Sequence, residues 1–415
     1  MKTLFLHIGM PKTGTSAVQY FLEINSDELK NQGFMYERMP YVYQGHHSRR
    51  NAHFLIGMVY DEEGKKDEKA KAARVDEGLN IVKEWFTKFD QVLLTEEQLW
   101  NFFGRHGFKV LGRVSKFCRE NGFTLKVVVY LRRQDDWLVS TYRQKVRGGS
   151  EQATLIEYFD DPSEISLNYD EILSGIEKKI GKENIILRKY DFSEFKGGKI
   201  ELDFLDALGL STTEDYVFAD EQINTSYPMN FIEMKRIINR LDGEGNTTSH
   251  TDVSLLWEHN LIRMREFIAD YREEILSDDM RADIMGRYAE GNRSVAERYL
   301  PEGEVLFSEK KKGLSDADVW KSDNDRRYED TVLFFADIIT EQQKKMSRLY
   351  ERQKRIEEKY NERLDKYKDA INTLQREIDS LETKYRLLND STDTLWRRIR
   401  YGIKWRLRKI FKKGN

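Results

Sequence analysis

A short apolar run that leads into a glycine-containing loop opens the chain, in the segment TLFLHIGMPKTGTS. The run predicts a buried strand over residues 3–9, and the pattern after the loop predicts a helix over residues 16–23. Three further apolar runs predict strands at residues 91–96, 125–133 and 184–191, with helical segments before or between them. Continuous apolar strands that alternate with helices are typical of a parallel sheet covered on both faces. The sequence therefore predicts an α/β fold.

The loop GMPKTGTS nearly matches the phosphate-binding pattern G-x-x-x-x-G-K-[ST]. Thr15 stands at the lysine position of that pattern, and the lysine, Lys12, comes earlier in the loop. Unpaired N–H groups and the helix dipole at the start of a helix attract an anion. We therefore expect the phosphate-binding residues of this loop to be Lys12, Thr13, Gly14, Thr15 and Ser16.

The acid that accompanies such a loop in nucleotide-triphosphate enzymes has no persuasive counterpart here. In those enzymes the lysine reaches the β- and γ-phosphates, and the neighbouring hydroxyl holds Mg²⁺. The strand predicted at residues 91–96 ends in Glu96 and Glu97 rather than in an aspartate. The single cysteine, Cys118, makes a disulfide within the chain impossible and argues against a cysteine metal site. The loop thus predicts a P-loop-type anion site that works without a metal.

A second polar segment, VVVYLRRQDDWLVSTYRQ, follows the third predicted strand. An arginine at a strand end and a serine on the next helix could hold one phosphate, because arginine binds phosphate in a bidentate manner. Alternatively, the charged residues of this segment could form a salt-bridge cluster at the surface. Together with PKTGTS, the segment resembles the nucleotide-binding motifs of sulfotransferases that use 3′-phosphoadenosine-5′-phosphosulfate (PAPS). The resemblance places the 3′-phosphate on Arg132 and Ser140, with Tyr142 two residues beyond. Arg133 is the second choice for the arginine, and Gln134 replaces a proline that is common in the family.

The resemblance covers about residues 1–310, and we assign a catalytic domain to residues 1–330 with a helical part from about 229 to 330. It implies a PAPS-dependent sulfotransferase that acts on a hydroxyl of a glycan or glycolipid, needs no metal, and releases 3′-phosphoadenosine 5′-phosphate (PAP). Lys12 would stabilise the leaving phosphate, and Glu97, or else Glu96, would be the general base. Either glutamate could instead cap the following helix.

Three histidines in the segment GHHSRRNAHFL, His46, His47 and His53, are candidates for acceptor binding or proton transfer, although an ordinary surface loop explains them nearly as well. Two other functions remain open for the whole chain. One is an ATP-dependent P-loop kinase, which Mg²⁺-dependent ATP binding would reveal. The other is a non-catalytic scaffold that retains the fold and assembles partners through its C-terminal part.

The C-terminal part differs in pattern from the rest of the chain. In residues 335–390, apolar side chains recur three and four positions apart from Leu364 onward, which is typical of a coiled coil. We therefore expect a homo-oligomer; a long surface helix packed on its own domain is the alternative. The tail, residues 391–415, has nine Lys or Arg and no acid after Asp393. It predicts a basic amphipathic helix at an anionic membrane surface, weakened by Gly402, or else a solvated end of the coil.

Charge and hydropathy set the expected location. Lys and Arg number 69 against 72 Asp and Glu, so no global positive field favours nucleic-acid binding. The first apolar run is too short for a signal peptide, and no window reaches the length of a membrane span. We therefore expect a cytoplasmic protein, with the tail at the inner face of the cell membrane.

Overall fold

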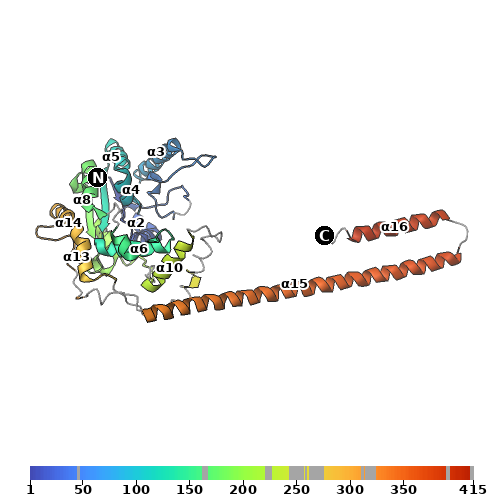
Figure 1. Ribbon diagram of the computed structural model, residues 1–415. Helices are drawn as coiled ribbons and strands as arrows, with labels where there is room; N and C mark the ends of the chain where they lie inside the picture. The colour runs from blue at the N-terminus through green and yellow to red at the C-terminus, as the bar shows by residue number, and fades with distance from the viewer. Residues whose placement is uncertain are drawn as a thin grey trace. The chain divides into compact units, whose positions relative to one another are not determined.

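A computed structural model describes most of the chain, and Figure 1 shows it coloured from the N-terminus to the C-terminus. The chain divides into two compact units, Met1–Phe334 and Phe335–Asn415. The described residues are 1–43, 47–160, 167–219, 227–242, 257, 259–260, 275–309, 313, 324–388 and 393–411.

The first unit is built around a five-stranded parallel sheet with the strand order β2-β3-β1-β4-β5. Its strands are β1 (Thr3–His7), β2 (Phe34–Met35), β3 (Gln91–Thr95), β4 (Thr124–Leu131) and β5 (Ile185–Lys189). The four strands expected from apolar runs are confirmed to within a few residues at their ends. The fifth, β2, has only two residues and is too short to leave a pattern in the sequence.

Helices cover both faces of this sheet. On one face, Phe5, Leu93 and Tyr130 belong to a buried cluster with side chains of helices α1, α2 and α9. On the other face, helices α5 and α8 contact β4. These helices are α1 (Thr15–Ile24), α2 (Ser26–Asn31), α5 (Lys109–Glu120), α8 (Tyr169–Ile180) and α9 (Ile200–Leu208). Burial on both faces explains why the strand sequences are continuously apolar. The predicted α/β fold of the P-loop type is confirmed.

Further α-helices of this unit lie among the described residues. They are α3 (Glu68–Trp85), α4 (Leu99–His106), α6 (Gln134–Arg147), α7 (Leu155–Asp160), α10 (Met229–Asp242), α13 (Asp278–Arg287) and α14 (Ala289–Tyr299). Helix α3, one of the helical segments expected before β3, begins at Glu68, because the Asp67 carboxylate caps it by accepting a hydrogen bond from the Ala70 N–H group at 2.8 Å. Much of the helical part assigned to residues 229–330, including most of residues 253–276, lies outside the described residues.

Two helices make up the rest of the described chain. Helix α15 (Asn324–Leu388) starts in the first unit, where the Phe334 ring packs on Phe231 at 5.8 Å between centroids, and continues through the second unit. Helix α16 (Asp393–Phe411) runs through Gly402 without a break. None of the helices among the described residues combines the length and the apolarity needed to cross a membrane.

Candidate active site

The loop between β1 and α1 has an unusual backbone. Lys12 adopts a left-handed conformation with φ of 69°, and Gly14, the residue before α1, has φ of 71°. A non-glycine residue rarely adopts this conformation, and such residues gather at functional sites. A Cβ atom at Gly14 would lie 2.5 Å from the Ile200 side chain and 3.1 Å from the Tyr190 ring. Because Gly14, the residue before α1, has no side chain that could cap the helix, the amide groups of the first turn stay available to a ligand.

Three side chains from the end of β4 and the helices that follow hold this loop. The Arg132 guanidinium donates a hydrogen bond to the Lys12 carbonyl at 2.7 Å, and the Trp137 indole donates one to the Pro11 carbonyl at 2.8 Å. The Arg132 guanidinium also lies over the Tyr190 ring, 5.3 Å from its centroid. The Tyr169 hydroxyl fixes the backbone of Arg132 by donating to its carbonyl at 2.5 Å. The two polar segments singled out in the sequence therefore meet in space.

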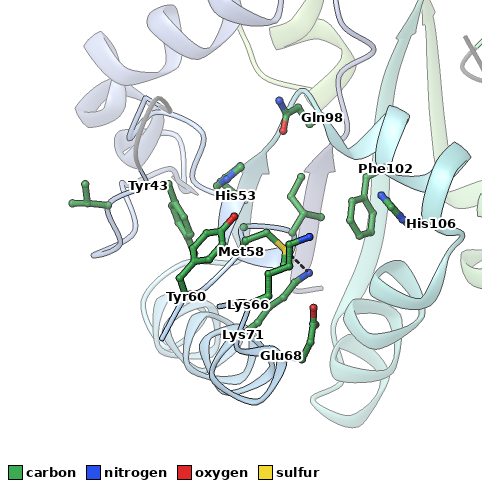
Figure 2. Close-up of a pocket in the computed structure, with 13 residues that line it drawn as sticks. Tyr43, His53, Met58, Tyr60, Lys66, Glu68, Lys71, Gln98, Phe102 and His106 are labelled. Atoms are coloured by element: carbon green, nitrogen blue, oxygen red, sulfur yellow. Dashed lines mark hydrogen bonds between the residues drawn. The ribbon is translucent and has the colours of Figure 1, made fainter. Parts of the chain in front are cut away.

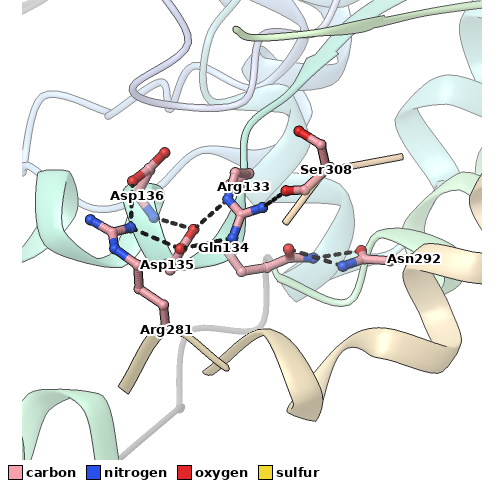
Figure 3. A network of polar contacts seen from close by, with 7 residues as sticks. All are labelled: Arg133, Gln134, Asp135, Asp136, Arg281, Asn292 and Ser308. Carbon is pink, nitrogen blue, oxygen red and sulfur yellow. Dashed lines mark hydrogen bonds and ion pairs between the residues drawn. The ribbon is translucent and has the colours of Figure 1, made fainter. Parts of the chain in front are cut away.

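Arg133 lies in a network of polar contacts, which Figure 3 shows. Its guanidinium is buried and donates two hydrogen bonds of 3.1 Å to the two carboxylate oxygens of Asp135, and a third to the Ser308 carbonyl. Asp135 also accepts a hydrogen bond from Arg281 at 2.9 Å, and Arg281 bonds Asp136 at 3.0 Å. A salt-bridge cluster thus exists here, but it is buried, links α6 to α13, and includes Arg133 rather than Arg132.

Positive charges gather around the loop. Burial lowers the pKa of the Lys12 ammonium, and the nearby Arg132 and Arg147 guanidinium groups lower it further, whereas Glu97 opposes them. Among the described residues, Lys12 has no carboxylate within ion-pair distance. An anion bound between these three cations would relieve their mutual repulsion. Their donors therefore suit the phosphate groups of a nucleotide.

Glu96 is fully buried and has all of its partners inside the protein. Its carboxylate accepts two hydrogen bonds from the Arg50 guanidinium and one from the Gln98 N–H group at 2.8 Å, and lies 2.8 Å from His53 Nδ1. These hydrogen bonds and positive charges lower the pKa of Glu96 despite its burial. Such a carboxylate holds the surrounding chain in place and leaves no surface for a substrate.

Glu97 lies beside the loop and stays accessible. The turn that carries it is tied to the end of β1, since the Glu96 N–H group donates to the His7 carbonyl at 3.0 Å. A Cβ atom at Gly9 would lie 3.2 Å from the Glu97 Cα atom, so the glycine allows the two backbones to approach. The Glu97 side chain is 30% exposed and lies 3.3 Å from Arg50. Burial raises the pKa of its carboxyl group, and the charge of Arg50 opposes that effect.

The other residues singled out in the sequence are spread around this centre. Thr13 and Thr15 are buried, whereas Ser16 is exposed in the first turn of α1. Ser140 is half-buried on α6, and Tyr142 points into the core, where its hydroxyl donates to Glu233 at 3.0 Å. His47 is exposed and close enough to favour the charged form of Glu97. His53 is buried against Glu96, and His46 lies outside the described residues.

Sequence reasoning missed two basic residues of this region, Arg50 and Arg147. Arg147 follows Ser140 by seven positions on α6, a spacing that places both on one side of a helix and could have revealed it. Nothing in the sequence pairs Arg50 with Glu96, because 46 positions separate them. Within the described part of the chain, no group of three or more His, Cys, Asp or Glu side chains is arranged to hold a metal ion.

Comparisons with known proteins give distant matches. No family model matches the chain. A 120-residue stretch, 28% of this chain, is 35% identical to an uncharacterized protein of Archaeoglobus fulgidus, and it spans only 31% of that protein's length.

Three solved structures align with the chain at low similarity. A sulfotransferase from Alicyclobacillus acidocaldarius is 15% identical, and the alignment covers 59% of this chain and 95% of that one with a TM-score of 0.31. The sulfotransferase domain from the curacin biosynthetic pathway is 10% identical, with 51% of this chain and 75% of that one covered and a TM-score of 0.29. The sulfotransferase domain from the Synechococcus PCC 7002 olefin synthase is 12% identical, with 65% of this chain and 95% of that one covered and a TM-score of 0.29. At these identities and TM-scores the matches assign neither a family nor an activity to this chain.

Proposed function

We propose that this chain is a sulfotransferase that moves the sulfuryl group of PAPS to a hydroxyl of a glycan or glycolipid. The observation that carries the proposal is the meeting of Lys12, Arg132 and Glu97 at one loop. The cations Lys12 and Arg132 lie together at the start of α1, and a partly buried carboxylate adjoins them. This arrangement supplies both an anion site and a base, which transfer of an anionic group to a hydroxyl requires.

The nucleotide would bind through two sets of donors. The amide groups that open α1, with Thr13, Gly14, Thr15 and Ser16, are suited to the 5′-phosphate. Arg132 and Ser140 are suited to the 3′-phosphate, and Arg147 adds positive charge on the same side of α6 as Ser140. PAPS, when bound, supplies an activated sulfuryl group and leaves as PAP. Because the Lys12 ammonium lies among the same donors, it can stabilise the charge that develops on the departing phosphate oxygen.

Glu97 would act as the general base. Its raised pKa makes the carboxylate a better proton acceptor than an ordinary surface glutamate, while Arg50 keeps it ionised and oriented. In an in-line transfer, the acceptor oxygen forms its bond to sulfur as the bond from sulfur to the phosphate oxygen breaks. Glu97 takes the acceptor's proton in that step. Glu96 would serve as a positioning residue, because it holds Arg50.

Titration calorimetry with PAP in the presence of a chelator tests the nucleotide site. We expect binding by the wild-type chain and a loss of about tenfold or more in Arg132→Met, because a charge-assisted hydrogen bond to phosphate is removed. Arg133→Met is the matched control: its partner is Asp135, so PAP affinity should persist in the folded fraction. ATP binding that depends on Mg²⁺, without any response to PAP, would replace this proposal with a kinase.

Transfer itself requires a second measurement. Radiolabelled PAPS incubated with the protein and a glycan or glycolipid extract should label a product in the wild type and not in Lys12→Ala. If PAP binds but the wild type labels no acceptor class, the scaffold alternative is favoured.

A further inference from the structure

A cavity of about 900 Å³ lies next to direct neighbours of the two glutamates, and Figure 2 shows the side chains that line it. One wall includes His53, which is bonded to Glu96, and Gln98, which directly follows Glu97. Helices α3 and α4 and the chain around residues 56–60 supply the other walls. Glu97 is not among the lining residues, but its neighbour in the chain, Gln98, is. Its volume lies in the range of pockets that enclose a small ligand.

Aromatic rings line much of this cavity. Tyr43, Tyr60 and Phe102 all contribute to it. Tyr43 is held edge-on to the His53 ring at 4.6 Å between centroids and packs closely on Gly57, where a Cβ atom would come within 2.4 Å of its ring. Tyr60 is 58% exposed, so its ring is accessible to a ligand. Flat aromatic rings of this kind can pack against the apolar C–H face of a sugar ring.

Two lysines face the same cavity, and within the described part of the chain neither forms an ion pair with a carboxylate. The Lys71 ammonium lies 3.4 Å from the Met58 sulfur and 6.0 Å from the centroid of the Phe102 ring, and neither group is an anion. Lys66 also lines the cavity, and so does Glu68. Among the described residues, no ion pair joins Glu68 to either lysine. The cavity thus combines aromatic walls with an uncompensated positive charge, which favours an anionic ligand that carries an apolar face.

We infer that this cavity is the acceptor subsite and that it takes an acidic sugar. The sugar ring would pack on Tyr60 and Phe102, and its carboxylate or phosphate would pair with Lys71 and Lys66. In this placement a hydroxyl of the sugar would lie toward Gln98, whose neighbour in the chain is Glu97. The role of the cavity in transfer rests on the proposed function, whereas its preference for an acidic sugar does not.

The test uses the full-length protein and three disaccharides that differ only at the sixth carbon of one ring. They are a neutral diglucoside, its glucuronate form and its 6-phosphate form, and binding is titrated by ligand-observed NMR. We expect at least one acidic form to bind about tenfold more tightly than the neutral one, because one charged hydrogen bond is worth roughly that factor. Which acid binds better identifies the anionic group.

Lys71→Met should remove that preference, and Lys71→Arg should retain most of it. Lys69→Met is the matched control, because Lys69 is exposed on the same helix and does not line the cavity. PAP affinity, measured in parallel, should be equal in all four proteins.

The outcomes separate the two proposals. Acidic sugar binding that depends on Lys71, in a protein that does not bind PAP, would overturn the proposed function and support the acidic-sugar site. PAP binding with equal affinity for the three disaccharides, or with a preference that Lys71→Met leaves intact, would overturn the inference drawn here.

Discussion

Glu96 and Glu97 are adjacent in the chain, yet the structure gives their carboxylates opposite surroundings. Glu96 is fully buried with Arg50 and His53 around it, whereas Glu97 is 30% exposed beside the loop. We expect Glu97→Gln to lower kcat/KM for sulfate transfer by about 10² to 10⁴, the usual contribution of a general base, without changing the melting temperature. Glu96→Gln should instead lower the free energy of unfolding by about 3–5 kcal/mol, because it leaves the buried Arg50 charge uncompensated.

Steady-state kinetics and thermal unfolding of both variants check this prediction. A Glu97→Gln enzyme with wild-type kcat/KM would show that the base lies elsewhere. A Glu96→Gln protein as stable as the wild type would contradict the structural role given to the Arg50 pair.

Lys12 leads to a prediction about pH at the same scale. Burial and the charges of Arg132 and Arg147 lower its pKa, so its ammonium loses a proton at a lower pH than an ordinary lysine does. PAP affinity should therefore fall as pH rises through that pKa, because the neutral amine no longer attracts phosphate. Arg147→Met removes one repelling charge, so the fall in PAP affinity should occur at a higher pH. Lys12→Arg should abolish the fall in PAP affinity, since arginine stays charged. Calorimetry with PAP across the alkaline range measures the pH at which affinity falls. If that pH is the same in Arg147→Met as in the wild type, the assignment of the fall to Lys12 is contradicted.

Among the helices and strands, the length of each element decided whether the sequence could predict it. Strands β1, β3, β4 and β5 have five to eight residues each and were found from their apolar runs. The two-residue strand β2 and the six-residue helix α2 are too short to show a period.

The candidate site likewise has parts that the sequence predicts and parts that only the structure shows. The loop was found because its glycines and hydroxyl residues follow a fixed spacing. The spacing to Ser140 favoured Arg132 as the phosphate ligand and left Arg133 as the second choice, because both follow the same strand; in the structure it is Arg132 that bonds the loop. What separates them is Asp135 and its bond to Arg281, a residue 146 positions later in the chain.

Helix α16 carries the proposal of membrane contact. Trp405 is 58% exposed and Ile399 is 44% exposed on a helix rich in basic residues. We propose that this helix binds an anionic lipid surface, and each basic residue near such a surface contributes about 1 kcal/mol. Replacing three of them should therefore weaken binding to phosphatidylserine vesicles by about a hundredfold or more. The variant carries Arg400→Gln, Lys404→Gln and Arg408→Gln.

Co-sedimentation with vesicles measures this effect, and neutral phosphatidylcholine vesicles should bind neither protein strongly. A matched control removes the same charge from α15 through Lys354→Gln, Arg355→Gln and Lys359→Gln. Equal loss of binding in both variants would indicate a general charge effect and contradict a specific role for α16.

At the scale of the whole molecule, the division at Phe334 separates the candidate site from the exposed part of α15. The first turns of α15 belong to the first unit, where Asp330 accepts a hydrogen bond from Asn230 at 2.7 Å and Phe334 packs on Phe231. A chain cut after Phe334 keeps these contacts. We expect it to bind PAP as the full chain does, and calorimetry measures this. A large loss of affinity would show that the second unit contributes to the site.

The second unit carries the proposal of self-association. Apolar side chains of α15 that recur at coiled-coil spacing, such as Leu364, Leu374 and Leu381, are 36–55% exposed in the single chain. Burying such a seam between copies would remove this apolar surface from water. The full-length protein with Leu374→Asp and Leu381→Asp should therefore fall to the mass of one chain in light scattering, while the wild type scatters as a dimer or larger. Gln375→Asp with Thr383→Asp adds the same charge beside the seam and should keep the wild-type mass. A wild-type protein that already has the mass of one chain would remove the coiled coil and leave α15 as a long solvated helix.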